Sequence, residues 1–226
     1  MAPLISCIMP TANRPDLLKL AIDSFLSQTY QNKELLILDD GKKPSLDIMQ
    51  YGGQGNIKYQ YDGPIRKAIP KKLNILCAWA AGEIIARFDD DDYSAPERLE
   101  TQFKVIKEGS NFTGFHSLLF YAEKTGKVYK YFTSRHFACG TSFMFTKELW
   151  EANHFDELKM LGEDIAFLDN CGKYFVATNG EKLLVARIHE KTSANKTLEV
   201  WNGYTEQDKN ALPVGFLSLI EEKIAA

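Results

Sequence analysis

Apolar and polar residues alternate in blocks along the first half of the chain. Short apolar runs at 4–9, 34–38, 56–61 and 83–88 predict strands, because the buried strands of a parallel sheet are nearly continuous hydrophobic stretches. Between them, apolar side chains recur every three or four positions at 17–26, 71–81 and 99–106, and this spacing predicts helices. A weaker helix is predicted at 45–51. Strands that alternate with helices predict an α/β fold, with a mostly parallel central sheet and helices on both faces.

The second half has a different pattern, which predicts a smaller β region. Apolar stretches at 112–120 and 128–132 flank Lys124-Thr125-Gly126 and predict a hairpin. The remaining elements predicted there are strands at 141–145, 174–178 and 183–188, a helix at 163–170, and an amphipathic segment at 214–224. We expect the last segment to pack on the body or to mediate assembly. We therefore expect one domain over 1–226, with halves at 1–110 and 111–200 and a C-terminal helical segment at 201–226.

Polar residues follow three of the predicted strands at the point where each strand ends. The first strand ends at Pro10-Thr11, the second at Asp39-Asp40, and the fourth runs into the acidic residues 89–92. Open α/β sheets bind their ligands beyond the carboxyl ends of the strands. The three polar clusters are therefore expected to converge on one edge of the sheet.

Composition and charge exclude several classes of protein. Of the 226 residues, 45% are apolar and 25% are charged, which is typical of a globular domain rather than a disordered chain. The formal charge of −3 gives no strong field toward nucleic acid or anionic lipid, so a nucleic-acid partner is not favoured. The four cysteines form no C-x-x-C pair, and no apolar run is long enough for a membrane span. We expect a reduced, cytoplasmic protein, or one peripheral to a membrane.

Four consecutive carboxylates, Asp89 to Asp92, are the strongest chemical signal. Neighbouring carboxylates repel one another, and a bound cation offsets that repulsion. Their hard oxygen atoms suit Mg²⁺ or Mn²⁺, which also accept oxygens from a substrate diphosphate. The alternative is a solvated acidic loop. The position of the run, directly after an apolar strand and before Pro96 and a helix, favours the metal site.

Five motifs in a fixed order carry a resemblance to a known family. They are Ile8-x-Pro10-Thr11-x-x-Arg14-Pro15, Leu38-Asp39-Asp40-Gly41, Asn74 with the stretch from Gly82 to Asp92, Gly162-Glu163-Asp164, and Arg187-Ile188-His189. Together they resemble the family 2 glycosyltransferases of GT-A fold, over about residues 4–193. Each motif is weak alone, and their order and spacing make the set specific.

The resemblance implies donor-binding roles in the first half. Asp39 matches an aspartate that accepts a hydrogen bond from a pyrimidine ring, although a simple turn is the alternative there. The residues matched to the loop around the nucleotide are Pro10, Thr11 and Arg14. The residues matched to the diphosphate and ribose region are Lys72, Asn74 and Asp89, with Asp90 at a variable position. The alternative for Arg14 is a surface cation near a helix start.

The resemblance also implies a metal shell and a catalytic base. Asp91 matches the metal ligand, Asp92 adds a ligand or holds the loop, and His189 completes the shell, with a structural histidine as its alternative. Asp164 matches the general base that removes the proton of the acceptor hydroxyl, and Glu163 orients the acceptor. The alternative for this pair is a helix start capped by two acidic residues.

The function implied is the transfer of one sugar, with inversion, from a nucleotide-diphosphate sugar to an acceptor hydroxyl. UDP-linked donors are favoured, with Mn²⁺ or Mg²⁺ as the cofactor, and the acceptor is a glycan, a lipid-linked glycan or another hydroxyl. Two alternatives stay open. A sugar nucleotidyltransferase usually has a Gly-rich phosphate loop after its first strand, which Pro10 to Arg14 does not offer. A catalytically silent nucleotide-sugar or glycan-binding module would not need Glu163, Asp164 and His189.

Overall fold

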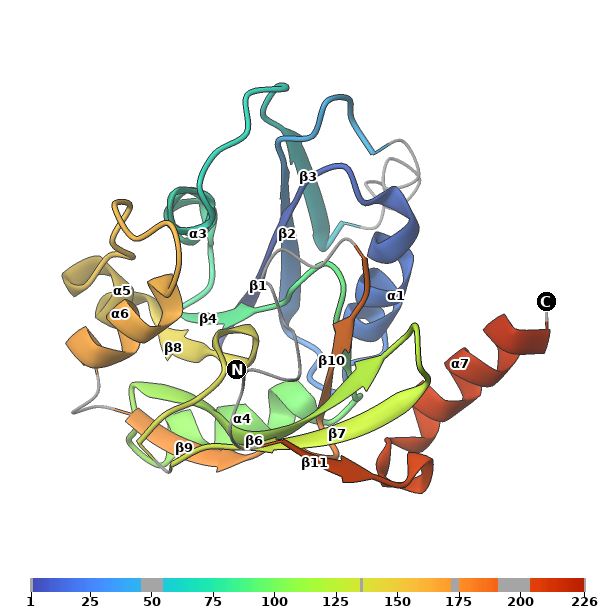
Figure 1. Cartoon of the computed structure of the whole chain (residues 1–226). Helices are drawn as coiled ribbons and strands as arrows, with labels where there is room; N and C mark the ends of the chain where they lie inside the picture. Colours follow the sequence, from blue (N-terminus) through green and yellow to red (C-terminus); the bar gives the residue numbers. More distant parts are fainter. Residues whose placement is uncertain (1, 46–54, 135, 172–174, 191–203, 226) are drawn as a thin grey trace.

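The computed structural model describes residues 2–45, 55–134, 136–171, 175–190 and 204–225 (Figure 1). The strands of the described chain are β1 (Ile5–Thr11), β2 (Lys33–Asp39), β3 (Ile57–Tyr61), β4 (Ile84–Arg87), β5 (Tyr93–Ser94), β6 (Phe112–Ala122), β7 (Lys127–Phe132), β8 (Met144–Thr146), β9 (Phe175–Asn179), β10 (Leu184–Ile188) and β11 (Tyr204–Gln207). The α-helices there are α1 (Pro15–Leu26), α3 (Ile69–Trp79), α4 (Arg98–Lys107), α5 (Lys147–Ala152), α6 (Glu163–Cys171) and α7 (Val214–Ala225).

One continuous sheet joins the two halves of the chain. Its strand order is β11-β7-β6-β8-β4-β1-β2-β3, with β9 and β10 paired to β6 and β5 paired to β10. The pairs β4–β1, β1–β2 and β2–β3 are parallel, and β8 is antiparallel to both β4 and β6. A parallel neighbour requires a connection that carries the chain back to the same end of the sheet, as α1 does between β1 and β2. The α/β fold with a mostly parallel central sheet is thus confirmed.

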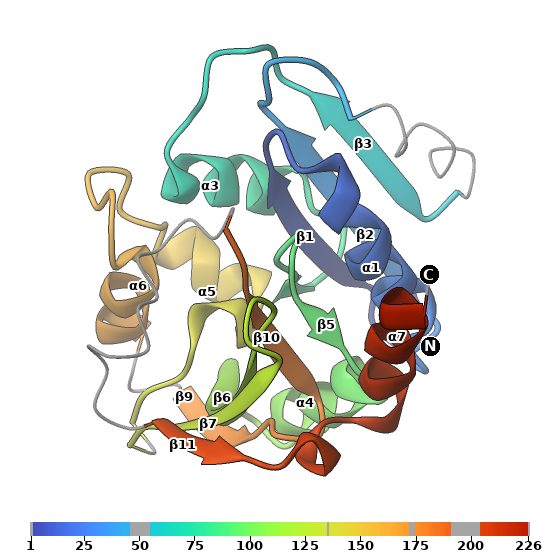
Figure 2. The same cartoon turned by 45° about the vertical axis from the view of Figure 1, so that its right-hand side comes forward.

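Alternation along the central strands places apolar side chains on both faces of the sheet, because successive residues of a strand point to opposite sides. Cys7 and Met9 of β1 pack in the cluster that contains α1 and Leu99 of α4. Ile8, between them, packs in the cluster that contains α3, α5 and α6. In Figures 1 and 2, α1 and α3 accordingly lie on opposite sides of β1 and β2.

The second half differs from the prediction in three places. The hairpin forms as β6 and β7, but residues Gly140–Ser142 are a 3₁₀ helix where a strand is predicted, and only Met144–Thr146 enters the sheet. Residues Tyr204–Gln207 form a strand within the predicted helical segment, since they pair antiparallel with β7. Helix α5 was not predicted from the hydrophobic pattern.

Nearly all of the weak helix predicted at 45–51 lies outside the described residues, as does Tyr174 of the strand predicted at 174–178.

Among the residues that the structure describes, none of the helices has the length and apolar character that crossing a bilayer requires.

Candidate active site

The ends of β1, β2 and β4 come together, as predicted from the parallel order. Thr11 is the last residue of β1 and pairs in register with Asp39, the last residue of β2. The Thr11 hydroxyl donates a 2.7 Å hydrogen bond to Oδ2 of Asp90, which follows β4. Parallel strands end on the same edge of a sheet, so residues 79 positions apart in sequence meet here.

Three of the four consecutive carboxylates form a cluster that could hold a metal ion. One oxygen from each of Asp89, Asp91 and Asp92 lies within 4.8 Å of the others, and Asp91 and Asp92 are buried. Oxygen donors at this spacing fit Mg²⁺ or Mn²⁺. This cluster adds Asp89 to the predicted ligands Asp91 and Asp92. The predicted ligand His189 lies outside it, with its Nε2 atom 3.0 Å from Oδ2 of Asp91.

Asp90 differs from its neighbours because its carboxylate accepts a hydrogen bond from Thr11 of the first strand in addition to its contact with Arg14. Oδ1 of Asp90 lies 2.9 Å from Nη1 of Arg14, and the same nitrogen lies 3.2 Å from Oδ2 of Asp91. Burial, followed by the charge of Asp91, raises the pKa of Asp90 to about 6. Burial disfavours the charged form of Arg14, but the negative charges of Asp90 and Asp91 have the larger combined effect and raise the pKa of Arg14. Arg14 therefore lies partly buried in the site, paired with two carboxylates, and is not a solvated surface cation.

The second half of the chain holds the end of the acidic run. Asp92 accepts hydrogen bonds from the Thr141 hydroxyl at 2.7 Å and from the backbone N–H of Arg187 at 3.0 Å. The Arg187 guanidinium donates to the backbone carbonyl of Asp91 at 3.1 Å and pairs with Glu123. The Arg187-Ile188-His189 motif therefore approaches the carboxylates through both its arginine and its histidine.

Asp39 is fully buried, and donors of the chain itself occupy both of its oxygens. Oδ1 accepts from the N–H of Gly41 at 2.9 Å, and Oδ2 accepts from the hydroxyls of Ser45 at 2.9 Å and Tyr59 at 2.8 Å. Burial and then the bond to Asp39 raise the pKa of Tyr59 well above its ordinary value. These bonds fix the loop after β2. The contact of Asp39 with a nucleotide base stays a prediction.

Lys72 and Asn74 make their described contacts within the protein. The Lys72 ammonium, 2% exposed, donates to Oδ1 of Asp40 at 2.6 Å and to the Thr11 carbonyl at 2.5 Å. The Asn74 side chain accepts hydrogen bonds from Trp150 Nε1 at 3.1 Å and from the backbone N–H of Phe155 at 3.0 Å. It also donates a hydrogen bond to the backbone carbonyl of Phe155 at 2.9 Å. Lys72 thus ties the ends of β1 and β2 together, and Asn74 ties α3 to the segment after α5. Their predicted roles in donor binding stay predictions.

Glu163 and Asp164 begin helix α6, where the partial positive charge of the helix N-terminus favours carboxylates. Glu163 Oε1 lies 3.3 Å from Nη1 of Arg87, and Nε of Arg87 lies 2.8 Å from Oδ1 of Asp89. A single guanidinium thus connects the candidate metal-binding cluster with the predicted acceptor side. Arg87 was missed among the site residues, although a charge in an otherwise apolar strand signals a buried partner.

Residues 6–177 match the model of glycosyl transferase family 2. The chain belongs to this family.

Relatives by sequence are also named as glycosyltransferases. An uncharacterized glycosyltransferase of Methanocaldococcus jannaschii is 27% identical over 191 residues, which cover 75% of this chain and 64% of the relative. An uncharacterized glycosyltransferase of Haemophilus influenzae is 35% identical over 107 residues, which cover 46% of this chain and 42% of the relative. The alignments thus span between about a third and two thirds of the length of the first curated relatives.

Solved structures show the fold of this family 2 glycosyltransferase chain. S. aureus TarS in complex with UDP-GlcNAc superposes with a TM-score of 0.68 at 19% identity, over 84% of this chain and 61% of TarS. The mannosyltransferase PcManGT from Pyrobaculum calidifontis, in complex with GDP-Man and Mn²⁺, gives a TM-score of 0.66 at 15% identity, over 84% and 59%. The GT-A fold is therefore shown.

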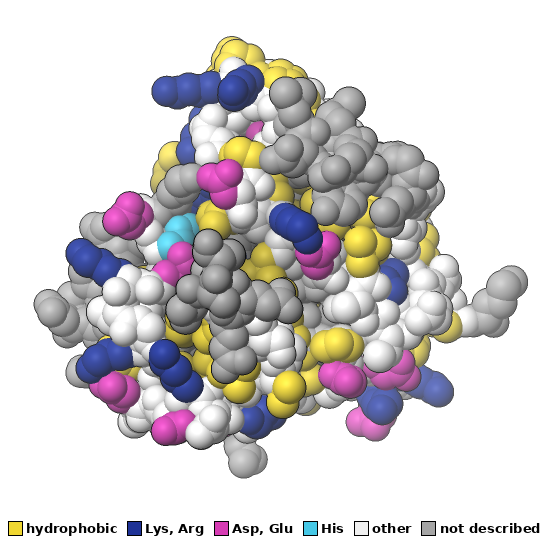
Figure 3. Space-filling model, turned by 90° about the vertical axis from the view of Figure 1, so that its right-hand side faces the viewer, with side chains coloured by type: hydrophobic (Ala, Val, Ile, Leu, Met, Phe, Trp, Pro, Cys, Tyr) yellow, Lys and Arg dark blue, Asp and Glu magenta, His cyan; other side chains and the backbone are white. Residues whose placement is uncertain are grey.

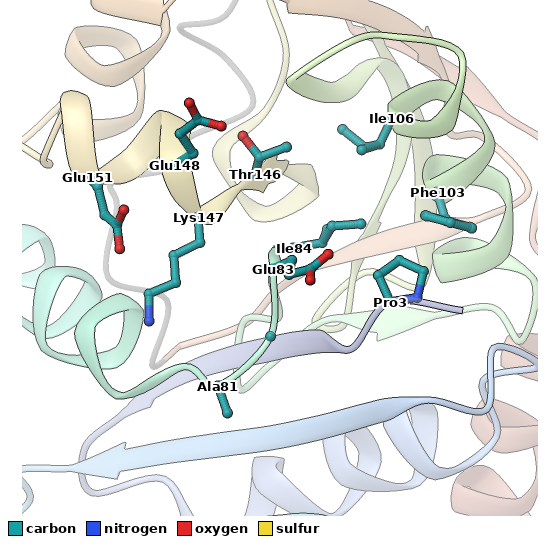
Figure 4. A pocket seen from close by; sticks show the side chains of 11 residues that line it. Pro3, Ala81, Glu83, Ile84, Phe103, Ile106, Thr146, Lys147, Glu148 and Glu151 are labelled. Atoms are coloured by element: carbon teal, nitrogen blue, oxygen red, sulfur yellow. The ribbon is translucent and has the colours of Figure 1, made fainter. Parts of the chain in front are cut away.

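A separate pocket of about 540 Å³ lies around the amino end of β4, at the opposite end of the central strands from the carboxylates. It is lined by residues 81–84, which lead into β4, and by Thr146 at the end of the antiparallel β8 (Figure 4). Acidic and basic side chains, among them Glu83, Lys147 and Glu151, surround it. Because it lies at the amino end of β4, it is remote from the carboxylates of this family 2 chain and is not its candidate active site.

The described surface on the side that Figure 3 presents mixes charges of both signs. Lys and Arg side chains are interspersed with Asp and Glu, and hydrophobic side chains are scattered among them (Figure 3). Nucleic-acid-binding faces carry clustered basic side chains instead. On this side, the described residues of the family 2 chain present no such cluster.

Proposed function

We propose that this chain transfers one sugar from a nucleotide-diphosphate sugar, favouring UDP as the nucleotide, to an acceptor hydroxyl with inversion at the anomeric carbon. One observation carries the proposal. The oxygens of Asp89, Asp91 and Asp92 converge within 4.8 Å at the carboxyl end of β4, in a chain of glycosyl transferase family 2. TarS and PcManGT, which share the fold, have been solved with a UDP-linked and a GDP-linked sugar respectively.

The three carboxylates would hold the divalent ion, with His189 beside Asp91. Bound there, Mn²⁺ or Mg²⁺ would supply Lewis-acid stabilisation for the negative charge of the leaving diphosphate. Asp164 accepts the proton of the acceptor hydroxyl while that oxygen forms a bond to the anomeric carbon. The bond between the anomeric carbon and the diphosphate oxygen breaks, and its electron pair leaves with the diphosphate. Glu163, fixed by Arg87, orients the acceptor relative to the donor.

The acceptor proposed is a lipid-linked glycan, one of the acceptors that the sequence leaves open. The segment directly before Glu163 exposes three large apolar side chains, Leu158 at 89%, Met160 at 70% and Leu161 at 81%. Exposed apolar groups beside a reaction site favour a substrate that covers them. Transfer to an octyl glycoside should therefore exceed transfer to the methyl glycoside of the same sugar. Replacing Leu158 and Leu161 by serine should abolish that difference, and equal transfer to both acceptors in the unmodified protein would refute this acceptor class.

The metal site is tested by nucleotide binding. UDP should raise the melting temperature with Mn²⁺ and not with EDTA, and Asp91→Asn should remove this Mn²⁺-dependent rise. Asp23→Asn is the matched control, because Asp23 is a partly exposed partner of Lys19 on α1, far from the cluster in sequence. The proposal requires release of UDP or GDP from at least one nucleotide sugar. If tight binding occurs without any such release, the chain is the silent binding module instead.

The base is tested by separating binding from turnover. Asp164→Asn should retain Mn²⁺-dependent nucleotide binding and lower the rate of nucleotide release by a factor of about 10² to 10⁴, the range that general base catalysis supplies. Full activity of Asp164→Asn would show that another group takes the proton.

A further inference from the structure

Arg87 is a buried cation at the carboxyl end of an apolar strand. The whole Arg87 residue is 9% exposed, and the other residues of β4 are all apolar, namely Ile84, Ile85 and Ala86. Its backbone is fixed on both sides, since its N–H donates to Phe143 O at 2.8 Å and its carbonyl accepts from Arg98 at 2.7 Å. A buried charge is tolerated only with bound partners, so the contacts of its side chain account for its presence.

The Arg87 guanidinium uses two different nitrogens for two distant carboxylates. Nε lies 2.8 Å from Oδ1 of Asp89, and Nη1 lies 3.3 Å from Oε1 of Glu163, 76 positions along the chain. All three side chains are largely buried, with exposures of 10%, 23% and 14%. Burial opposes the charge, but Asp89, Glu163 and Asp164 outweigh it and raise the pKa of Arg87. Arg87 therefore spans the gap between the metal-binding cluster and the start of α6.

Gly140 provides the second constraint on the same group of residues. A Cβ atom on Gly140 would lie 2.6 Å from Cβ and 2.7 Å from Oδ2 of Asp164, and 3.0 Å from Nη1 of Arg87. Real Cβ atoms essentially never approach other heavy atoms to less than 3.0 Å, so the two contacts with Asp164 would force a shift, and the contact with Arg87 would be tight. The backbone of residue 140 therefore packs directly against Asp164, and only glycine leaves room for this carboxylate beside Arg87.

We infer that Arg87 is a positioning residue, which together with Gly140 sets Glu163 and Asp164 at a fixed place relative to the donor-side carboxylate Asp89. The inference rests on the proposed function, in which Asp164 is the base. A planar guanidinium can hold two carboxylates in different directions, whereas the single ammonium of lysine cannot keep both contacts in the same geometry. Arg87→Lys should therefore fail to replace arginine.

Hydrogen exchange at the start of α6 tests the positioning without any substrate. Amide exchange in a peptide covering residues 162–171 should accelerate in Arg87→Met and in Arg87→Lys. Lys58→Met is the matched control, because Lys58 forms a half-exposed ion pair with Glu34 elsewhere in the sheet. Unchanged exchange at 162–171 in the Arg87 variants would overturn the inference, even if no donor were turned over. A wild-type protein that releases no nucleotide would refute the proposed function alone.

Kinetics with UDP-GlcNAc, or with GDP-Man if that donor is turned over, separate positioning from folding. Arg87→Met, Arg87→Lys and Gly140→Ala should each lower kcat, on the order of 100-fold for a displaced catalytic group, and leave the donor KM within a few-fold of wild type. Glu163→Gln combined with Arg87→Met should lower kcat no further than Arg87→Met alone. Full activity of Arg87→Lys, or additive losses in the double variant, would refute the assignment. If Arg87→Met does not fold, Arg87→Lys and Gly140→Ala still decide the question.

Discussion

Replacing Lys72 by methionine is expected to destabilise the fold more than it weakens donor binding. The Lys72 ammonium lies 2.6 Å from Oδ1 of Asp40, and the two side chains are 2% and 0% exposed. Burial lowers the pKa of Lys72 in spite of the attraction of Asp40, so desolvation outweighs the pairing for this group. Methionine fills a similar volume but carries no charge, so the buried Asp40 carboxylate loses the cation with which Lys72 pairs it.

The size of the effect follows from this burial. Removing one partner of a buried ion pair costs about 3–5 kcal/mol, because the remaining charge stays in a medium of low dielectric constant. In a chain of 226 residues, 1 kcal/mol corresponds to a shift in Tm of about 2–4 °C, so Tm should fall by about 6–20 °C. Adding Asp40→Asn removes the second charge, and the double variant should therefore be more stable than Lys72→Met alone.

Urea unfolding followed by circular dichroism, at pH 7.5 with EDTA, measures these free energies in the wild type, both single variants and the double variant. Lys71→Met is the matched control, since Lys71 is the exposed neighbour on α3 and its loss should change stability by less than about 0.5 kcal/mol. The reasoning fails if Lys72→Met unfolds at the wild-type urea concentration. Loss of UDP affinity at unchanged stability would instead support the donor-binding role that the family resemblance implies.

Three further predictions concern other groups. The fold raises the pKa of Asp90 from 3.8 to about 6, so the protonated form of Asp90 stabilises the folded state, and this stabilisation is lost as pH rises through about 6. In EDTA, the free energy of unfolding of Asp90→Asn relative to wild type should therefore rise by up to about 3 kcal/mol between pH 3.5 and 7.5. A difference that stays constant with pH would contradict this prediction. Asn74→Ala should cost about 1–3 kcal/mol and speed amide exchange around Phe155, since the backbone N–H of Phe155 loses its acceptor; unchanged exchange would contradict it. Gly82→Ala should cost about 1–3 kcal/mol in urea unfolding, because its Cβ would overlap the Leu4 carbonyl oxygen; wild-type stability would show that the strand end yields.

The first half of the fold could be predicted because each element has a local signal. The apolar run before Pro10 and the helical spacing after Pro15 are patterns within about 20 residues, and they correspond to β1 and α1. Parallel order then follows from alternation alone, and it brings Thr11, Asp39 and the acidic run to one edge. β11 and α5 lack such a signal. Tyr204–Gln207 is a strand because it pairs with β7, and that partner is more than 70 residues away.

The orientation of individual side chains could not be predicted from their spacing in the motifs. Lys72 and Asn74 are two positions apart in sequence, and the resemblance gives them related roles. A helix turns about 100° per residue, so these two side chains point roughly 200° apart. One consequently reaches Asp40 at the sheet edge, and the other reaches Trp150 in the second half of the chain. Arg87 was missed for a related reason, since its partner Glu163 is 76 positions away and no local pattern joins them.

The fold holds the acidic run in place with cations and hydrogen-bond donors from separate parts of the chain. Arg87 pairs with Asp89, Arg14 with Asp91, and the backbone of residue 187 with Asp92. These partners offset the repulsion of adjacent carboxylates, so the cluster does not require an ion in order to form. They also reduce the net negative charge that the cluster offers to a cation. A nucleotide diphosphate adds negative oxygens of its own, and the ion should therefore bind more tightly together with the nucleotide than alone.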